Sequence, residues 1–268
     1  MNPPSLTSQV VAVTRAELER PHSPDGDPGA QRRLCEGMGF TPPDWLRPGI
    51  AARTVFVDEL VMSSIATGLR QVVICGAGYD DRALRFRTPG VRFFELDHPD
   101  TQQDKASRLK ALDVGTSTVT LAAADFRTDD VAMVLARAGH DASAPSLFVC
   151  EGLIVYLDRA TCHRLLATLA ARAAPGSVLG ATLSTHADGA DSASVVAEAN
   201  SRRRRAATEP WQTILPAAEH LGLLTQAGWA VTRMLAAPAS GTNVSHGRRS
   251  LLIQASPAVH RDSGIMSS

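Results

Sequence analysis

Two glycines that follow an apolar run are the first residues whose spacing could serve a ligand. Gly76-Ala77-Gly78 comes directly after Val72–Cys75, which predicts a turn from a strand into a helix. Glycine lets the backbone turn sharply and, because it has no Cβ, lets a ligand come close to the chain. An ordinary tight turn is the alternative, since a lone G-x-G pattern often occurs by chance. The turn is a candidate binding site that needs support from other residues.

The residues after this turn bear on the kind of ligand. A dinucleotide-binding turn has a third glycine at the position where Asp81 stands, and that glycine makes room for a pyrophosphate. Asp80 precedes it, and two carboxylates beside a pyrophosphate would be unfavourable. We therefore expect a nucleoside cofactor without phosphates. S-adenosylmethionine, which carries a sulfonium cation, fits this best.

An acidic residue ends the next apolar run. Asp97 lies nineteen residues after Gly78, the interval at which an acid binds ribose hydroxyls in this kind of sheet. Glu95 points to the same side of the predicted strand, because side chains alternate along a strand. Asp97 is nearer the strand end and is our choice for the ribose. The role of Glu95 is left open: it is either the ribose ligand or the partner of a backbone amide.

Two further acids follow later apolar runs. Asp125 and Phe126 come just after Val119–Ala122, where a carboxylate and a backbone N–H could bind an adenine ring. Glu151 comes directly after Ser146–Cys150, and the end of a central strand lies at the ligand crevice of an α/β sheet. Each acid has an ordinary alternative as the cap of the helix that follows.

Alternating strands and helices must position these residues. Apolar runs separated by helical patterns indicate a parallel sheet covered on both faces, so the fold class is α/β, a doubly wound, mostly parallel Rossmann-like sheet of about seven strands. The predicted strands are Val72–Cys75, Val91–Leu96, Val119–Ala122, Ser146–Cys150, Ser177–Leu183, Trp229–Ala236 and Ser250–Ala255. The predicted helices after the first strand are Tyr79–Phe86, Asp100–Leu112, Asp129–Ala138, Arg159–Ala171, Asp188–Ala206 and Pro216–Ala227.

We expect a single domain over residues 1–268, made of three parts. Residues 1–70 form a helical extension, 71–185 the cofactor-binding core, and 186–268 a helical cover with the last strands. Within the extension, Ser5–Arg20 and Gly49–Thr67 have the apolar spacing of helices. The expected buried positions are Leu6, Val10, Val13 and Leu18 in the first helix, and Val55, Leu60, Val61 and Ile65 in the second.

Composition excludes several classes of partner. Lys plus Arg and Asp plus Glu are both 27, so no overall field favours nucleic acid or an anionic membrane, and a small molecule fits better. The basic run Arg202–Arg205 is expected to be a solvated helix face or to hold an acidic acceptor. The start of the chain lacks the features of a signal peptide, and no segment reaches membrane-spanning length. We expect a soluble cytoplasmic protein, either monomer or homodimer.

The four cysteines have no C-x-x-C pair. This spacing argues against a zinc site and against a disulfide framework, so we expect no metal. Cys75 and Cys150 each end an apolar run, where a thiol commonly acts as a small buried hydrophobic group.

The glycine turn Gly76–Gly78 and the acids Asp97, Asp125 and Glu151, in this order along the chain, resemble the leucine carboxyl methyltransferase-like family. The resemblance is to its bacterial S-adenosylmethionine-dependent O-methyltransferase branch in particular. The resemblance covers roughly residues 50–185, and Glu209-Pro210-Trp211 also looks like a family element. Its blocks are Ala52–Asp58, Gln71–Arg82, Phe94–Pro99, Ala124–Arg127 and Cys150–Leu157.

The resemblance implies a role for each matched residue. Arg53 would hold the methionine carboxylate of S-adenosylmethionine, a task that suits a guanidinium group. Glu151 would hold the methionine amino group. Gly76, Ala77 and Gly78 would line the path of the methionine and ribose, Asp97 would bind the ribose, and Asp125 with Phe126 would bind the adenine. Family members methylate protein carboxylates or small natural products, but the regions that cover the acceptor match loosely here.

Methyl transfer from a sulfonium requires alignment of the acceptor and exclusion of water. A carboxylate acceptor needs no general base, whereas a hydroxyl does. The candidate bases are His98, His186 and Tyr156, and His186 is the one to test first. Trp211 is a candidate for the wall of the acceptor pocket. S-adenosylhomocysteine would be the product. The alternatives are a nicotinamide-dependent oxidoreductase and a non-catalytic cofactor-binding protein.

Overall fold

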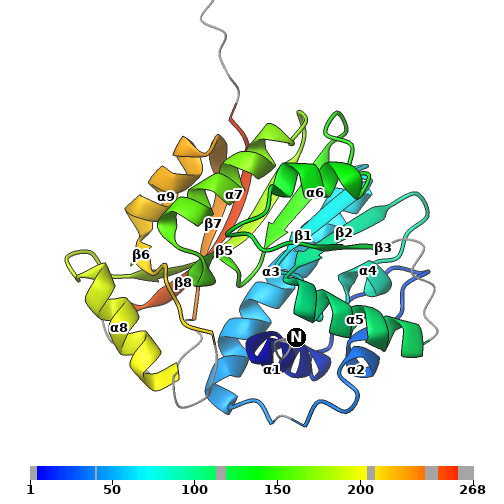
Figure 1. Ribbon diagram of the computed structural model, residues 1–268, viewed down its shortest axis with the longest axis horizontal. Helices are drawn as coiled ribbons and strands as arrows, with labels where there is room; N and C mark the ends of the chain where they lie inside the picture. The colour runs from blue at the N-terminus through cyan, green and yellow to red at the C-terminus, as the bar shows by residue number, and fades with distance from the viewer. Residues whose placement is uncertain (1–4, 40, 113–118, 204–208, 239–246, 259–268) are drawn as a thin grey trace, which may run out of the picture.

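The computed structural model describes residues 5–39, 41–112, 119–203, 209–238 and 247–258. Within these ranges, eight strands form one sheet in the order β3-β2-β1-β4-β5-β8-β7, and β6 pairs with β5 (Figure 1). All pairs except β5–β8 and β7–β8 are parallel. The strands are β1 Gln71–Cys75, β2 Arg92–Asp97, β3 Val119–Ala123, β4 Ser146–Cys150, β5 Val178–His186, β6 Leu215–Pro216, β7 Trp229–Ala237 and β8 Arg249–Pro257. The predicted mostly parallel sheet is confirmed.

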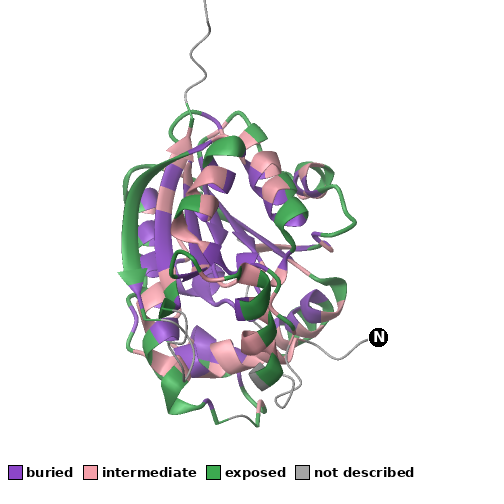
Figure 2. Ribbon diagram, turned by 90° about the vertical axis from the view of Figure 1, so that its left-hand side faces the viewer, coloured by how far each residue is buried: buried purple, intermediate pink, exposed green. Residues whose placement is uncertain are grey.

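Helices cover both faces of this sheet. Alternation along the strands sends Val73 and Cys75 to the face packed by α6, α7 and α9, while Val72 and Ile74 meet α3 and α4 on the other. Figure 2 shows the buried sheet between the two helical layers. The helices are α1 Leu6–Ala16, α2 Ala30–Leu34, α3 Arg47–Ala66, α4 Arg82–Arg85, α5 Pro99–Ala111, α6 Val131–Arg137, α7 Arg159–Ala171, α8 Ser192–Arg203 and α9 Ala217–Gln226, with short 3-10 helices η1 Asp44–Leu46 and η2 Ile154–Tyr156.

The two N-terminal helices form where the apolar spacing predicted them, but their buried faces differ from the prediction. In α1 the buried residues are Ala12, Thr14 and Arg15, because the helix packs both against a polar cluster through Arg15 and against a small apolar cluster through Ala12. In α3, Leu60 and Val61 are buried as expected, Ile65 packs partly against the core, and Val55 is exposed. The short elements α2 and β6 were not predicted.

The carboxyl ends of the parallel strands meet at one edge of the sheet. Helix α1 lies across this edge, since its Ser8 contacts the turn after β1 and its Arg15 reaches the residue after β4. Cys75 and Cys150 are fully buried free thiols at the ends of β1 and β4, as predicted. Among the described helices, none is long and apolar enough to cross a membrane.

Candidate functional site

The turn after β1 needs its glycines because protein atoms crowd it. Gly76 and Gly78 have φ of 69° and 50°, in the left-handed region that other residues disfavour. A Cβ on Gly78 would lie 2.7 Å from the Cβ of Ser8, and one on Gly76 would lie 3.0 Å from Cδ1 of Leu153. The predicted turn is present, but a neighbouring helix and loop account for the missing side chains. A ligand is not needed to explain them.

Asp97 lies against this turn, as the nineteen-residue interval predicted. Its Oδ2 accepts a hydrogen bond of 2.7 Å from the N–H of Gly78, and its Oδ1 accepts one of 2.7 Å from the N–H of His98. Burial raises the pKa of Asp97, while both amide donors oppose that shift. Each carboxylate oxygen has two acceptor positions, so Asp97 keeps acceptor capacity for hydroxyl groups.

Glu95 is occupied by a buried ion pair, which disfavours its role as the ribose ligand. The side chain is 1 % exposed and forms an ion pair with Lys105 of α5. Lys105 Nζ also donates to the carbonyl of Asp80 at 2.7 Å. Sequence spacing placed Glu95 and Asp97 on one side of β2, but packing of α5 covers only Glu95.

Asp125 and Phe126 follow β3, where they were predicted. The Asp125 carboxylate accepts the N–H of Arg127 at 2.9 Å, which makes a local turn rather than a helix cap. Asp130 caps α6 instead, by accepting the N–H of Met133 at 3.1 Å. The ring of Phe126 is buried in the core. The half-buried Asp125 carboxylate thus stays at the sheet edge.

Glu151 is surrounded by arginines. Its Oε1 lies 2.7 Å from Arg15 Nη2 and 3.1 Å from Arg53 Nε, and its Oε2 lies 2.9 Å from Arg82 Nη1. Burial opposes ionisation, but the three guanidinium groups outweigh it and lower the pKa of Glu151 to about 2. The carboxylate is therefore ionised, and the helix-cap alternative is wrong.

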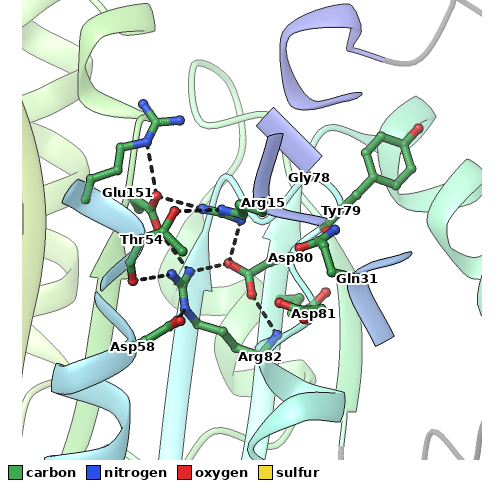
Figure 3. A network of polar contacts seen from close by, with 12 residues as sticks. Arg15, Gln31, Thr54, Asp58, Gly78, Tyr79, Asp80, Asp81, Arg82 and Glu151 are labelled. Carbon is green, nitrogen blue, oxygen red and sulfur yellow. Dashed lines mark hydrogen bonds and ion pairs between the residues drawn. The ribbon is translucent and has the colours of Figure 1, made fainter. Parts of the chain in front are cut away.

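These contacts belong to a larger network of buried charges (Figure 3). Asp80 pairs with Arg15 and Arg82, and Asp58 pairs with Arg82 at 2.6 Å. The network, which we call the arginine cluster, consists of Arg15, Arg20, Arg53, Arg82 and Arg85 with Asp58, Asp80, Asp81 and Glu151. Its five cations and four anions leave one positive charge in excess.

The arginine cluster corrects one argument from the sequence. Asp81 is 0 % exposed and its carboxylate binds Arg20 and Arg85, each at 2.7 Å. Burial opposes the ionisation of Asp80, but Arg82 and Arg15 hold its pKa below the usual range. Both negative charges are neutralised inside the protein, so they do not repel a pyrophosphate. The absence of the third glycine remains as the sequence evidence against a dinucleotide.

Several members of the cluster were missed from the sequence. Arg15 meets Glu151 across 136 positions of the chain, and no local pattern marks such a pair. Arg82 was not among the predicted site residues, although its guanidinium joins three acids. One signal was available: residues 15–85 contain nine arginines, and a charged side chain that becomes buried requires a partner.

A pocket opens beside the arginine cluster, between the loop after β4 and the strands β5 and β8. Arg53, Tyr156 and Trp211 line it, together with Arg249, the first residue of β8, and Arg248, which precedes the strand. The guanidinium of Arg53 packs against Gly152, where a Cβ would lie 3.1 Å from Nη1. Trp211 thus lines a pocket, and its role beside the acceptor stays a prediction.

The candidate base His186 is held by contacts within the protein, and its role as a base stays a prediction. It ends β5 and is buried, and its Nδ1 donates to the carbonyl of Ala187 at 2.8 Å. In that tautomer Nε2 accepts from the hydroxyl of Ser192, also at 2.8 Å. Both ring nitrogens form hydrogen bonds inside the protein.

His98, another candidate base, caps α5 through Nδ1. Within the described residues, no group of three His, Cys, Asp or Glu side chains is arranged for a metal ion.

The predicted role of the basic run Arg202–Arg205, a solvated helix face or a site for an acidic acceptor, stays a prediction. Arg202 and Arg203 end helix α8, but their side chains lie outside the described ones, as do the residues Arg204 and Arg205.

Comparison with known proteins identifies the family of this chain. The family model described as leucine carboxyl methyltransferase matches residues 19–170, more than half of the chain. A protein of Streptomyces coelicolor, provisionally named an S-adenosyl-L-methionine-dependent methyltransferase, is 37% identical over 164 residues, which are 61% of this chain and 54% of that protein. A protein of Streptomyces avermitilis with the same provisional name is 38% identical over 166 residues, with the same coverage. The chain spans about half the length of the curated relatives it matches.

Solved structures share the fold at low sequence identity. A protein of Thermobifida fusca, provisionally named a methyltransferase, has a TM-score of 0.61 at 15% identity and covers 96% of each chain. The magnesium protoporphyrin IX methyltransferase of Synechocystis, solved with bound S-adenosylhomocysteine, has a TM-score of 0.51 at 14% identity and covers 85% of this chain and 93% of that one. This sequence folds as a class I methyltransferase and belongs to the leucine carboxyl methyltransferase family.

Proposed function

We propose that this protein binds S-adenosylmethionine at the carboxyl edge of its sheet and catalyses methylation of an oxygen atom on a small-molecule acceptor. The observation that carries the proposal is the contact between Asp97 and the turn at Gly78, at the strand ends where this fold binds nucleosides. The family assignment supports the same cofactor. It gives no support to a nicotinamide-dependent oxidoreductase.

The charges at the site fit the proposed cofactor. The arginine cluster has one more cation than anions, so a carboxylate added to it balances the charge. Arg53 suits that task because its side chain is 17% exposed, whereas the other four arginines of the cluster are 0–6% exposed. Desolvation lowers the pKa of Arg53, against the attraction of Glu151, so a second carboxylate would stabilise its charge.

The remaining roles follow from position. Asp97 would accept hydrogen bonds from the ribose hydroxyls with the acceptor capacity it retains. Asp125 with the backbone at Phe126 would bind the adenine. Glu151 would hold the methionine ammonium in exchange for one of its guanidinium contacts. The bound cofactor supplies an electrophilic methyl group on a cationic sulfur.

The protein's own contribution to the transfer is alignment and exclusion of water. A carboxylate acceptor is already nucleophilic and needs no proton removed. For a hydroxyl acceptor, Tyr156 is the candidate that lines the pocket.

Calorimetric titration tests this proposal directly. We expect S-adenosylmethionine and S-adenosylhomocysteine to bind with micromolar dissociation constants, about −8 kcal/mol, and NAD to give no signal. Tight binding of NAD without binding of S-adenosylmethionine would refute the cofactor assignment. Formation of S-adenosylhomocysteine that depends on an added acceptor separates an enzyme from a non-catalytic binding protein.

A further inference from the structure

The pocket beside Glu151 is cationic. Its described lining contains three arginines, Arg53, Arg248 and Arg249, and no acidic residue. The remaining lining is mostly small, with hydroxyl groups from β5 and β8 and the apolar side chains of Val155 and Leu183. Guanidinium groups bind an organic anion more strongly than a neutral or cationic molecule, because hydrogen bonds to a charged acceptor are stronger.

Sheet topology explains why two of these arginines reach the ligand edge. Strand β8 runs antiparallel to β5, with Thr185 opposite Arg249. The first residues of β8, rather than its last, therefore lie at the carboxyl end of β5. Arg249 is the first residue of β8 and Arg248 directly precedes it, so both reach the ligand edge although they are far in sequence from the other site residues.

The side chain of Arg248 is held in place by the ring of Trp211. Its side chain lies over the ring of Trp211, with Cζ 5.2 Å from the ring centroid, and the residue is only 9% exposed. A guanidinium in a poorly solvated position attracts an anion more strongly than one in water. The stack with the indole also fixes its direction.

The wall that carries Trp211 is itself fixed. The N–H of Trp211 donates to Asn200 Oδ1 at 2.8 Å, and Asn200 Nδ2 donates to the carbonyl of Trp211 at 2.7 Å. The next residue, Gln212, donates its N–H to the carbonyl of Val155 at 2.7 Å. The segment is thus bonded to both α8 and η2, and a ligand meets a preformed wall.

The arginines reach the pocket from two sides. Arg53 of α3 contacts Gly152 in the loop after β4, while Arg248 and Arg249 come from the beginning of β8. Strand β5 lies between β4 and β8 in the sheet, so the backbone of that loop and the beginning of β8 are about two inter-strand spacings apart, about 9–10 Å. Because Arg53 is the proposed partner of the cofactor's carboxylate, Arg248 and Arg249 are left for a second anion.

We propose that Arg248 and Arg249 bind an anionic group of the methyl acceptor, and that this group is distinct from the oxygen that is methylated. The acceptor is then an organic acid, and its methylated product keeps a negative charge at the distant group. The identification of this anion as the methyl acceptor rests on the proposed function, whereas the binding of an anion at this pocket does not.

The first test reads the charge around Trp211 without any assumed ligand. Trp45 is exposed and Trp229 is fully buried, so in a Trp45→Phe background the quenchable fluorescence comes from Trp211. At constant ionic strength we expect the ratio of iodide to caesium quenching constants to exceed that of free N-acetyltryptophanamide by at least about threefold. Arg248→Gln with Arg249→Gln should bring the ratio down to the free value.

Two controls keep this test specific. Arg233→Gln removes an exposed cation of β7, near Glu59 and outside the pocket, and should leave the ratio unchanged. Arg248→Lys keeps the charge and should keep most of the ratio. An equal ratio in the wild type and in N-acetyltryptophanamide would overturn the proposal, and so would a ratio that the double substitution does not change.

The second test uses a matched acid and amide, indole-3-acetate and indole-3-acetamide, titrated by NMR. We expect the acid to bind at least about fivefold more tightly, or about 1 kcal/mol, and the preference to disappear in the double variant. Equal affinities, or no binding of the acid up to about 10 mM, would refute the anion site. Titration of the wild type with S-adenosylhomocysteine reads the cofactor site separately, so failure of one proposal is distinguished from failure of the other.

Discussion

Asp97 is the residue on which the cofactor proposal depends most. Its two oxygens hold the backbone on both sides of the ligand edge, at Gly78 and at His98. The same oxygens are the proposed ribose acceptors. A single carboxylate therefore holds the backbone of the turn and provides the oxygens proposed to bind the ribose.

Asp97→Asn should weaken the binding of S-adenosylhomocysteine by at least tenfold. The amide keeps one acceptor oxygen, and a hydrogen bond to a charged group contributes about 1.5–3 kcal/mol. Calorimetric titration measures the loss. Asp141→Asn is the matched control, because that exposed acid bonds only locally to Ser143 before β4, and its affinity should stay at the wild-type value. Unchanged affinity in Asp97→Asn would remove the ribose role.

At the scale of elements, α1 is the part of the fold that departs most from what its sequence suggests. It has an apolar pattern, yet its buried face carries Thr14 and Arg15 and docks on the glycine turn. The close approach of Ser8 to Gly78 fixes how near the helix comes.

Gly78→Ala should lower the free energy of unfolding by about 2–5 kcal/mol, because left-handed strain adds to a steric clash with Ser8. Gly90→Ala is the control: its φ is 77° and no atom lies within 4 Å of a Cβ there, so it should cost about 1–2 kcal/mol. Urea unfolding measures both.

A second substitution identifies the source of the loss. In a Ser8→Gly background the clash is absent, and Gly78→Ala should then cost about as much as Gly90→Ala. If the cost in that background stays at its full value, α1 does not press on the turn as described.

At the scale of the whole molecule, the arginine cluster joins segments that are far apart in sequence. Arg82 alone connects α3 through Asp58, the turn after β1 through Asp80, and the loop after β4 through Glu151. A network of this kind is costly to bury, and removal of one member leaves its partners uncompensated.

Arg82→Met should lower the free energy of unfolding by about 3–5 kcal/mol, since three buried acids lose a cation. Arg137→Met, at the exposed end of α6, should change it by no more than about 0.5 kcal/mol. Urea denaturation at pH 7 compares the two. Equal effects would show that the cluster contributes little to stability.

Acid should unfold the protein through the same cluster. The pKa of Glu151 is lowered to about 2, and that of Asp80 is also below its usual range. Folded-state pKa values below the unfolded ones give stability that is present above about pH 4.5 and is lost as the pH falls towards 2. Urea midpoints should fall steeply over that range, and addition of sodium chloride at pH 7 should change them little, because buried pairs are poorly screened. A midpoint that is flat from pH 5 to 3 would contradict this.

Much of this protein follows from the sequence alone. Apolar runs of strand length alternating with helical patterns determined the sheet, and the spacing from Gly78 to Asp97 determined which acid would meet the turn. Both are local or short-range properties, since periodicity and the geometry of one strand–helix–strand unit fix them. Asp125 and Glu151 at the ends of β3 and β4 follow from the same rule for parallel strands.

Only the tertiary structure decided which partner each charged side chain has. Arg15 pairs with Glu151, and Lys105 pairs with Glu95. Both ring nitrogens of His186 form hydrogen bonds within the protein. The antiparallel last strand brings Arg248 to the pocket. No periodicity predicts such pairings, because charges are matched in space by packing and desolvation, between segments that the sequence separates by more than a hundred residues in the case of Arg15 and Glu151.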